Sequence, residues 1–194
     1  MRHASRLRPP APRHHGRRRP AGKRRQVDGA HDHSADWVAE FRGVRRTTKL
    51  ADAKGAVQTE IVTTSFTLKG GDARRAVTFA INGGPGASSA WLNLGAIGPW
   101  RVPFSNPIIP SATPTPVDNA ETWLDQTDLV FIDPPGTGFS RVTASDDARR
   151  HFYSVEGDID TLAAVIRRWL EAHGRLLSPK YIVGESYGGF RGPK

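Results

Sequence analysis

Short apolar runs, each closed by turn residues, recur along the central and C-terminal parts of the chain. They are AVTFAI at 76–81, TDLVFID at 127–133 and KYIVG at 180–184. Runs of this length without polar alternation are typical of strands covered on both faces, as in a parallel sheet. The β-branched segment AVQTEIVTTSFTL at 56–68 predicts an earlier strand or hairpin. Its expected core contacts are Val57, Ile61, Val62, Phe66 and Leu68.

A long helix is expected between the last two of these strands, from about Ser154 to His173. Apolar residues recur there at spacings of three and four, which gives one stripe able to pack on a sheet. Acidic residues occupy the first turns, and Gly174 can end the helix in a left-handed conformation. The order strand, helix, strand predicts a crossover between parallel strands and an α/β sheet. The stripe comprises Ile159, Leu162, Val165, Ile166, Trp169 and Leu170.

The first 36 residues lack such a pattern and are expected to form a disordered basic leader, followed by one domain at 37–194. The net charge of +9 belongs to this leader, since ten Arg and Lys and no acidic residue fall within residues 1–25. With few large apolar side chains, the leader cannot bury enough surface to offset its ordering entropy. A solvated leader is favoured over an arm that binds nucleic acid. Its Arg, Pro, His and Gly bias leaves open a shifted-frame translation of residues 1–30.

The composition excludes several function classes. The chain has no cysteine, so disulfide frameworks, thiolate metal sites and thiol nucleophiles are excluded. No apolar run approaches the roughly 18 residues of a membrane-spanning helix, so membrane insertion is not expected. The charges at the N-terminus are not followed by an apolar stretch, so no signal peptide is visible.

The segment GESYG at 184–188 directly follows the last predicted strand. A Gly-x-Ser-x-Gly sequence in this position is typical of a nucleophile elbow, a sharp turn that presents a serine hydroxyl at the end of a strand. Gly184 and Gly188 are the small residues that such a turn needs where backbone segments press together. An ordinary tight turn is the alternative, but the preceding strand favours Ser186 as a nucleophile.

A nucleophilic serine also needs N–H donors for the oxyanion that develops during acyl transfer. One normally comes from the residue after the nucleophile, here Tyr187. The loop AINGGPGASS at 80–89 follows a predicted strand and offers Gly84 as the second donor. A purely structural glycine turn is the alternative, and a phosphate loop is disfavoured because no Gly-Lys-Ser/Thr follows.

Three motifs in this order, NGGPGASS at 82–89, FIDPPGTGFS at 131–140 and GESYGG at 184–189, resemble the serine carboxypeptidases, a branch of the α/β-hydrolase fold. The resemblance covers about residues 50–192. It implies that Gly84 supplies an oxyanion-hole amide and that Asn82, with Gly83 in the same segment, binds the C-terminal carboxylate of a peptide substrate. It further implies that Glu185 shares this role in its protonated form, which favours activity at acidic pH. FIDPPGTGFS is expected to form a structural turn.

What the resemblance implies for the reaction is hydrolysis of the last peptide bond through an acyl-enzyme, with no metal or cofactor. The substrate would be a peptide or protein C-terminus. Relatives in this family are mostly exported, so a periplasmic or secreted location is expected although no signal peptide is visible.

Some positions depart from the family. Many members have a cysteine where this chain has Ala87, and a nearby acid where NLGAIGP at 93–99 has none. The missing acid weakens carboxylate recognition and keeps an esterase or acyltransferase as an alternative. Trp91 and Trp100 are expected to be core residues rather than pocket walls.

The base of a catalytic triad is not found among the histidines. Five of the seven fall in the leader, and His151 and His173 flank the predicted helix. Asp128 and Asp133 flank a strand and are expected to be turn formers or surface groups. Only YGGFRGPK follows Ser186, so the chain is expected to be an N-terminal fragment that is inactive alone. A non-catalytic fragment with an anion-binding tail remains the other alternative.

Overall fold

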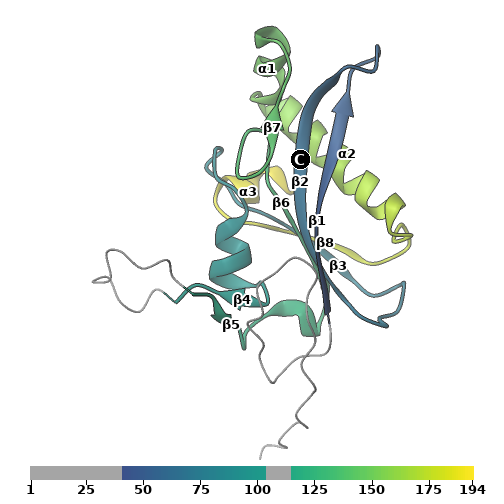
Figure 1. The fold of residues 1–194 in the computed structure, drawn as a ribbon, viewed down its shortest axis with the longest axis vertical. Coiled ribbons are helices and arrows are strands. Elements are labelled where there is room, and N and C mark those ends of the chain that lie inside the picture. Colours follow the sequence, from purple (N-terminus) through teal and green to yellow (C-terminus); the bar gives the residue numbers. More distant parts are fainter. Residues whose placement is uncertain (1–40, 104–114) are drawn as a thin grey trace, which may run out of the picture.

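The computed structural model describes residues 41–103 and 115–194, so the predicted leader lies outside the described residues. A mixed sheet in the order β1-β2-β6-β3-β8 dominates this part, with β7 added beside β2 and a separate β4–β5 pair (Figure 1). The strands are β1 (Phe41–Ala51), β2 (Val57–Leu68), β3 (Val77–Ile81), β4 (Trp100–Arg101), β5 (Val117–Asp118), β6 (Asp128–Ile132), β7 (Arg141–Val142) and β8 (Lys180–Gly184). The helical segments are η1 (Leu92–Ala96), η2 (Trp123–Asp125), α1 (Asp146–Phe152), α2 (Val155–Ala172) and α3 (Tyr187–Arg191).

The predicted α/β architecture is confirmed in the half of the sheet that follows β2. Strand β3 pairs in parallel with β6 on one side and with β8 on the other, so the crossover through α2 passes over β3. All five residues of β3 and all five of β6 are buried, as their continuous apolar runs predict. Strand β8 differs, because it lies at the end of the sheet and Tyr181 and Ile182 are exposed. The prediction that this third run is covered on both faces is wrong.

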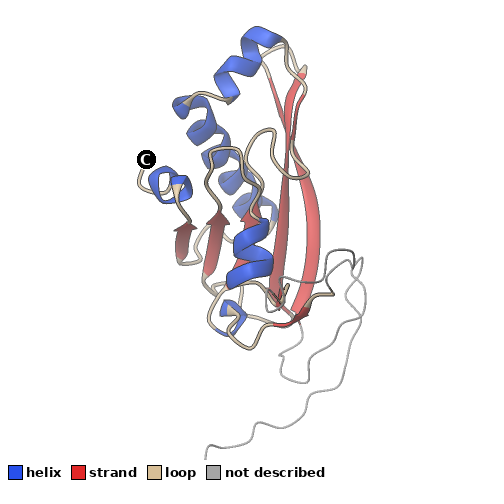
Figure 2. Ribbon diagram, turned by 90° about the vertical axis from the view of Figure 1, so that its left-hand side faces the viewer, coloured by secondary structure: helices blue, strands red, loops and turns tan. Residues whose placement is uncertain are grey.

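Alternate residues of the buried strands divide the core between the two faces of the sheet. Val130 and Ile132 pack with Phe79 and with the apolar stripe of α2, which includes Val165. Leu129 and Phe131 point to the other face and pack with residues of η1 and η2. Figure 2 shows α2 and η1 on opposite sides of the strands. Because side chains alternate along a strand, continuous apolar runs supply both layers.

The long helix agrees closely with the sequence prediction. Ser154 is the N-cap and its hydroxyl accepts from the N–H of Gly157, while His173 is the C-cap. Gly174 adopts φ +64°, the left-handed conformation expected after a helix. Leu162, Val165, Trp169 and Leu170 are buried, and Ile166 packs against the same cluster.

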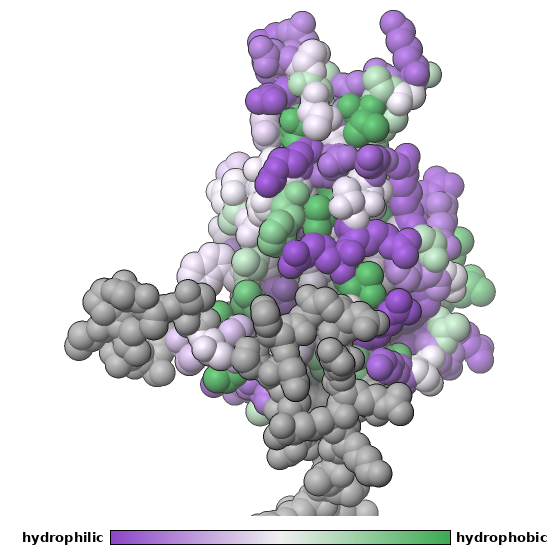
Figure 3. Space-filling model, viewed as in Figure 1, coloured by the Kyte–Doolittle hydropathy of each residue, from purple (hydrophilic) through white to green (hydrophobic). Residues whose placement is uncertain are grey.

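The N-terminal half of the sheet is an antiparallel hairpin of β1 and β2. Ile61, Val62 and Phe66 are buried as predicted, but Val57 is exposed because it lies at the far end of the hairpin. That end extends beyond the rest of the sheet beside α1, and hydrophilic residues prevail there on the face drawn in Figure 3. Strand β1 (FRGVRRTTKLA) was not predicted, since its burial pattern is mostly exposed or intermediate.

Asp128 is a buried ion-pair centre, so the expectation of a surface or turn-forming group is wrong. Its side chain is 2% exposed and accepts from Arg75 Nε at 3.2 Å and from Arg175 Nη1 at 2.6 Å. The backbone N–H of Leu68 adds a further bond of 3.0 Å. The carboxylate therefore ties together β2, the loop before β3 and the loop before β8.

Candidate active site

The segment GESYG forms a tight turn between β8 and α3. Ser186 has φ 54° and ψ −121°, and no other described residue apart from glycine has a positive φ. The N–H groups of Gly188 and Gly189 donate to the carbonyls of Glu185 and Ser186 at 2.8 and 2.9 Å. A backbone of this kind costs about 1–3 kcal/mol and is held only by its surroundings. It leaves Ser186 exposed at the carboxyl end of the sheet, in the geometry of a nucleophile elbow.

Two glycines leave the space that this turn needs. A Cβ atom on Gly184 would lie 2.1 Å from the carbonyl oxygen of Gly188. A Cβ atom on Gly188 would lie 2.1 Å from the carbonyl oxygen of Ile81, at the end of β3. Both distances are far below contact distance, so any side chain at either position would push the elbow away from the sheet.

The loop after β3 lies directly against the elbow. A Cβ atom on Gly83 would lie 2.5 Å from the backbone nitrogen of Tyr187 and 2.7 Å from the carbonyl oxygen of Glu185. The N–H of Glu185 donates to the Ile81 carbonyl at 3.2 Å. Gly84 is exposed like Ser186 and adopts φ +107°, a conformation that favours glycine. The parallel pairing of β3 and β8 therefore brings the two glycine motifs together.

Asn82 and Glu185 are also brought together. The amide nitrogen of Asn82, Nδ2, donates to Glu185 Oε2 at 3.0 Å, and Asn82 Oδ1 accepts from the N–H of Leu92 at 3.0 Å. The second bond fixes which end of the amide faces Glu185. Asn82 is fully buried whereas Glu185 is exposed, so only the glutamate of this pair is open to solvent.

The segment FIDPPGTGFS supports this arrangement from the neighbouring strand. Asp133 accepts from the N–H of Ser89 at 3.0 Å and from the N–H of Phe139 at 3.1 Å. The hydroxyl of Ser89 bonds to the Ile132 carbonyl and accepts from the N–H of Asn82 at 3.2 Å. Asp133 is thus a turn former, as expected, and its turn positions the start of the Asn82 loop.

Arg191 is a buried residue of the site region that the sequence did not reveal. Its guanidinium donates to the carbonyls of Asn82 and Pro85 and to the carboxylate of Asp158 in α2. Its partners lie 33 to 109 residues away along the chain. A single arginine in a short segment gives no sequence signal for contacts at such separations.

Other residues considered from the sequence lie elsewhere. Trp100 packs edge to face on Phe41 and Phe66, as a core residue does, whereas Trp91 is 62% exposed, so its expected core position is wrong. His173 stacks on Trp169 with ring centroids 4.1 Å apart. Among the described residues, no histidine hydrogen-bonds to Ser186.

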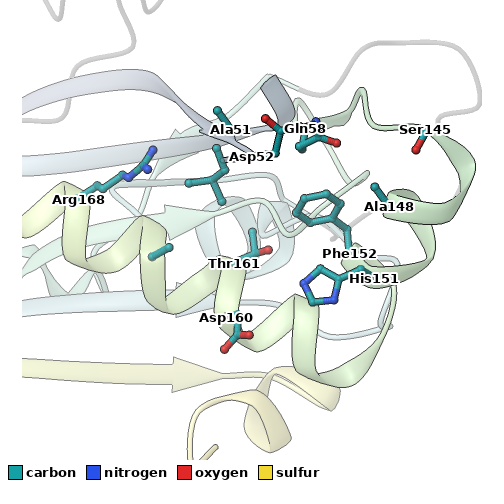
Figure 4. A pocket seen from close by; sticks show the side chains of 12 residues that line it. Ala51, Asp52, Gln58, Ser145, Ala148, His151, Phe152, Asp160, Thr161 and Arg168 are labelled. Atoms are coloured by element: carbon teal, nitrogen blue, oxygen red, sulfur yellow. Dashed lines mark hydrogen bonds between the residues drawn. The ribbon is translucent and has the colours of Figure 1, made fainter. Parts of the chain in front are cut away.

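A cleft of about 720 Å³ lies apart from this site, between the far end of the β1–β2 hairpin and helices α1 and α2 (Figure 4). His151, Asp160 and Arg168 are among its lining residues, but none of these residues belongs to the three glycine-containing motifs. The carboxylate of Asp52 caps the hairpin turn, and Arg168 donates to the carbonyl of Lys49. Asp52 and Arg168 are therefore engaged in the local fold.

Within residues 41–103 and 115–194, no group of three or more acidic or histidine side chains is placed to hold a metal ion. No helix in these ranges has the length and apolar character needed to cross a membrane.

Known proteins resemble this chain in sequence. The sequence model described as serine carboxypeptidase matches residues 66–194. The pheromone-processing carboxypeptidase KEX1 of Debaryomyces hansenii is 32% identical over 124 residues, which is 61% of this chain and 16% of that protein. KEX1 of Talaromyces marneffei is 35% identical over 115 residues, covering 56% of this chain and 16% of its own. The chain thus spans about a sixth of the length of these relatives.

A solved structure shares the fold. The crystal structure of Kex1(delta)p, a prohormone-processing carboxypeptidase from Saccharomyces cerevisiae, matches with a TM-score of 0.57 and 25% identity, over 76% of this chain and 31% of that one. The described sheet and its helices therefore form part of an α/β-hydrolase fold, as predicted. With a family match over residues 66–194, this chain belongs to the serine carboxypeptidase family.

Proposed function

We propose that this chain carries the nucleophile, the oxyanion hole and the carboxylate-binding group of a serine carboxypeptidase that acts on peptide C-termini. The observation that carries the proposal is the contact of the Gly83 loop with the amide of Tyr187, beside the Asn82–Glu185 hydrogen bond. In this arrangement the exposed Ser186 has the main-chain N–H groups of the Gly83 loop and of Tyr187 on one side. The carboxyl group of Glu185 is its neighbour in the chain. The relatives named above are carboxypeptidases, which agrees with this reading.

In the proposed reaction, Ser186 Oγ attacks the carbonyl carbon of the last peptide bond while a general base takes its proton. The N–H groups of Gly84 and Tyr187 donate to the oxyanion of the tetrahedral intermediate. The C–N bond then breaks, the amine takes the proton, and water releases the acyl group from Ser186. Glu185, oriented by Asn82, meets the substrate carboxylate, and the two carboxyl groups share one proton because like charges in contact disfavour double ionisation. Neither His151, which lines the cleft beside α1, nor His173, which stacks on Trp169, serves as the base.

The first prediction uses imidazole as a substitute base. A fluorophosphonate should label Ser186 very slowly in the 194-residue chain, because its hydroxyl stays protonated. Added imidazole should accept that proton as fluoride leaves phosphorus, and should raise the labelling rate by at least about tenfold. Intact-mass measurement with peptide mapping gives the rate and the modified residue.

Two serine variants control this experiment. Ser186→Ala should abolish the imidazole-dependent labelling, whereas Ser145→Ala, at another exposed serine, should leave it unchanged. Equal labelling of several serines would contradict the nucleophile assignment. Fast stoichiometric labelling without imidazole would show that a base is already present and would overturn the expected inactivity of the chain.

The second prediction concerns the carboxylate. An N-blocked dipeptide with a free C-terminus should slow the labelling of Ser186, and the same dipeptide as its C-terminal amide should protect less. Glu185→Ala should weaken protection by the free acid about tenfold, since a hydrogen bond to a charged group contributes about 1.5 kcal/mol.

The matched control for the carboxylate is Glu121→Ala, which removes an exposed glutamate that pairs with Arg101 at the surface. It should leave protection by both dipeptides unchanged. If the free acid and the amide protect equally in the unchanged protein, exopeptidase specificity is contradicted, and an esterase or acyltransferase becomes the better assignment.

A further inference from the structure

Arg191 places a buried cation beneath the loop that carries Gly84. Its side chain is 2% exposed, and its Nε lies 2.6 Å from Oδ2 of Asp158, which is itself 8% exposed. The remaining donors bond to main-chain carbonyls: Nη1 to Asn82 O at 2.7 Å and Nη2 to Pro85 O at 3.1 Å. These two carbonyls bracket Gly84 in the sequence, so one planar guanidinium holds the loop on both sides of the proposed oxyanion donor.

These bonds restrict the directions of the neighbouring N–H groups. In a trans peptide, the N–H points opposite to the C=O of the same unit. The Asn82 carbonyl is held by Arg191, so the Gly83 N–H points away from the guanidinium. The Gly83 carbonyl accepts from the N–H of Ala87 at 3.1 Å, so the Gly84 N–H points away from that side of the turn. The orientation of the Gly84 donor is thus fixed by bonds on consecutive peptide units.

The same side chain also connects this loop to the second proposed donor. Arg191 lies on α3, which starts at Tyr187 directly after the nucleophile. Its guanidinium carbon lies 4.7 Å from the centre of the Tyr187 ring. Asp158, in the first turns of α2, anchors the guanidinium from the helix layer. The Gly84 and Tyr187 amides therefore belong to two segments that both contact Arg191.

We propose that Arg191 is a positioning residue of the oxyanion hole, which sets the Gly84 amide relative to the Tyr187 amide through the carbonyls of Asn82 and Pro85. The inference rests on the proposed function and deepens it. Any buried guanidinium needs acceptors for its five N–H donors. In this protein the planar guanidinium binds both carbonyls that flank Gly84, those of Asn82 and Pro85. A lysine ammonium lacks the planar arrangement of donors that this requires.

The test is the imidazole-dependent labelling of Ser186 in Arg191→Ala and Arg191→Lys. We expect a 10- to 100-fold lower rate in Arg191→Ala, because misplacement by about 1 Å costs catalysis on that order. Arg191→Lys should recover only part of the rate. Added guanidinium, well below denaturing concentrations, should accelerate Arg191→Ala but not the unchanged protein. Protection by the free-acid dipeptide should change less than twofold, since the Asn82 side chain is held separately by Leu92.

Each outcome separates this inference from the proposed function. If the unchanged protein shows no imidazole-dependent labelling, the proposed function fails first. If it labels as expected but folded Arg191→Ala labels at the same rate, the positioning role is refuted while the nucleophile stands. A lower rate that guanidinium does not restore assigns Arg191 to structure alone and also refutes the proposal.

Arg167→Ala, at an exposed arginine paired with Glu171, is the control and should label normally. Should Arg191→Ala not fold, by near-ultraviolet circular dichroism, Arg191→Lys decides: an unchanged rate refutes positioning.

Discussion

Replacing Asp128 by Asn is expected to lower the free energy of unfolding by about 3–5 kcal/mol, because it leaves the buried Arg175 and the partly buried Arg75 without their counterion. Arg75 and Arg175 are 16% and 9% exposed and both bond to this carboxylate. The asparagine side chain has nearly the same volume, so the change isolates the charge from packing. Urea denaturation of the protein, followed by tryptophan fluorescence, measures the loss.

The matched control is Asp147→Asn. Asp147 pairs with Arg150 on the exposed surface of α1, where an ion pair contributes about 0–1 kcal/mol. Its replacement should therefore be nearly neutral. A loss below about 1 kcal/mol in Asp128→Asn would mean that the two arginines find other acceptors, and that the carboxylate does not hold the three loops together.

Gly188→Ala should cost about 3 kcal/mol of stability and should also abolish labelling of Ser186. The new Cβ would lie 2.1 Å from the Ile81 carbonyl oxygen, a backbone atom at the end of a fully buried strand that cannot give way. Relief requires α3 to move outward, which separates the elbow from the Gly83 loop. Overpacking of this kind typically costs 1–3 kcal/mol or more. Urea denaturation and labelling are measured on the same protein.

Gly189→Ala is the adjacent control with the same chemical change. A Cβ there would meet Gly184 O at 3.7 Å, an ordinary contact. Because alanine favours a helix over glycine by about 1 kcal/mol, this variant should keep or slightly raise stability. If both substitutions are tolerated equally, the close packing of α3 on β3 is not what holds the elbow in place.

The central strands and α2 could be predicted from the sequence because their pattern and their burial agree. Strands β3 and β6 are buried on both faces, and apart from Asp128 at the start of β6 their residues are apolar or, at Thr78, small. Strand β1 could not be predicted in this way, since it lies at the edge of the sheet and carries exposed arginines. Strand β8 has the apolar composition of a buried strand, but it lies at the edge of the described sheet. Its burial was therefore predicted wrongly.

The residues of the candidate site also differ in whether the sequence alone could reveal them. Ser186, Gly83 and Gly84 could be found because their local turns impose residue types that can be read in sequence. Arg191 could not, because its role depends on partners brought from distant segments, and the same holds for Asp128 outside the site. A buried charge is indistinguishable in sequence from a solvated one until its neighbours are known.

The Asn82–Glu185 hydrogen bond joins residues 103 positions apart, across the parallel pairing of β3 with β8. Closing so long a segment is an entropically slow step, and it completes late relative to local structure. On the proposed function, a newly made or misfolded chain therefore carries only an ordinary alcohol at Ser186. The pairing of β3 with β8 and the meeting of the two glycine motifs occur together, so Ser186 cannot attack a peptide bond before the chain has folded, even when a base is supplied.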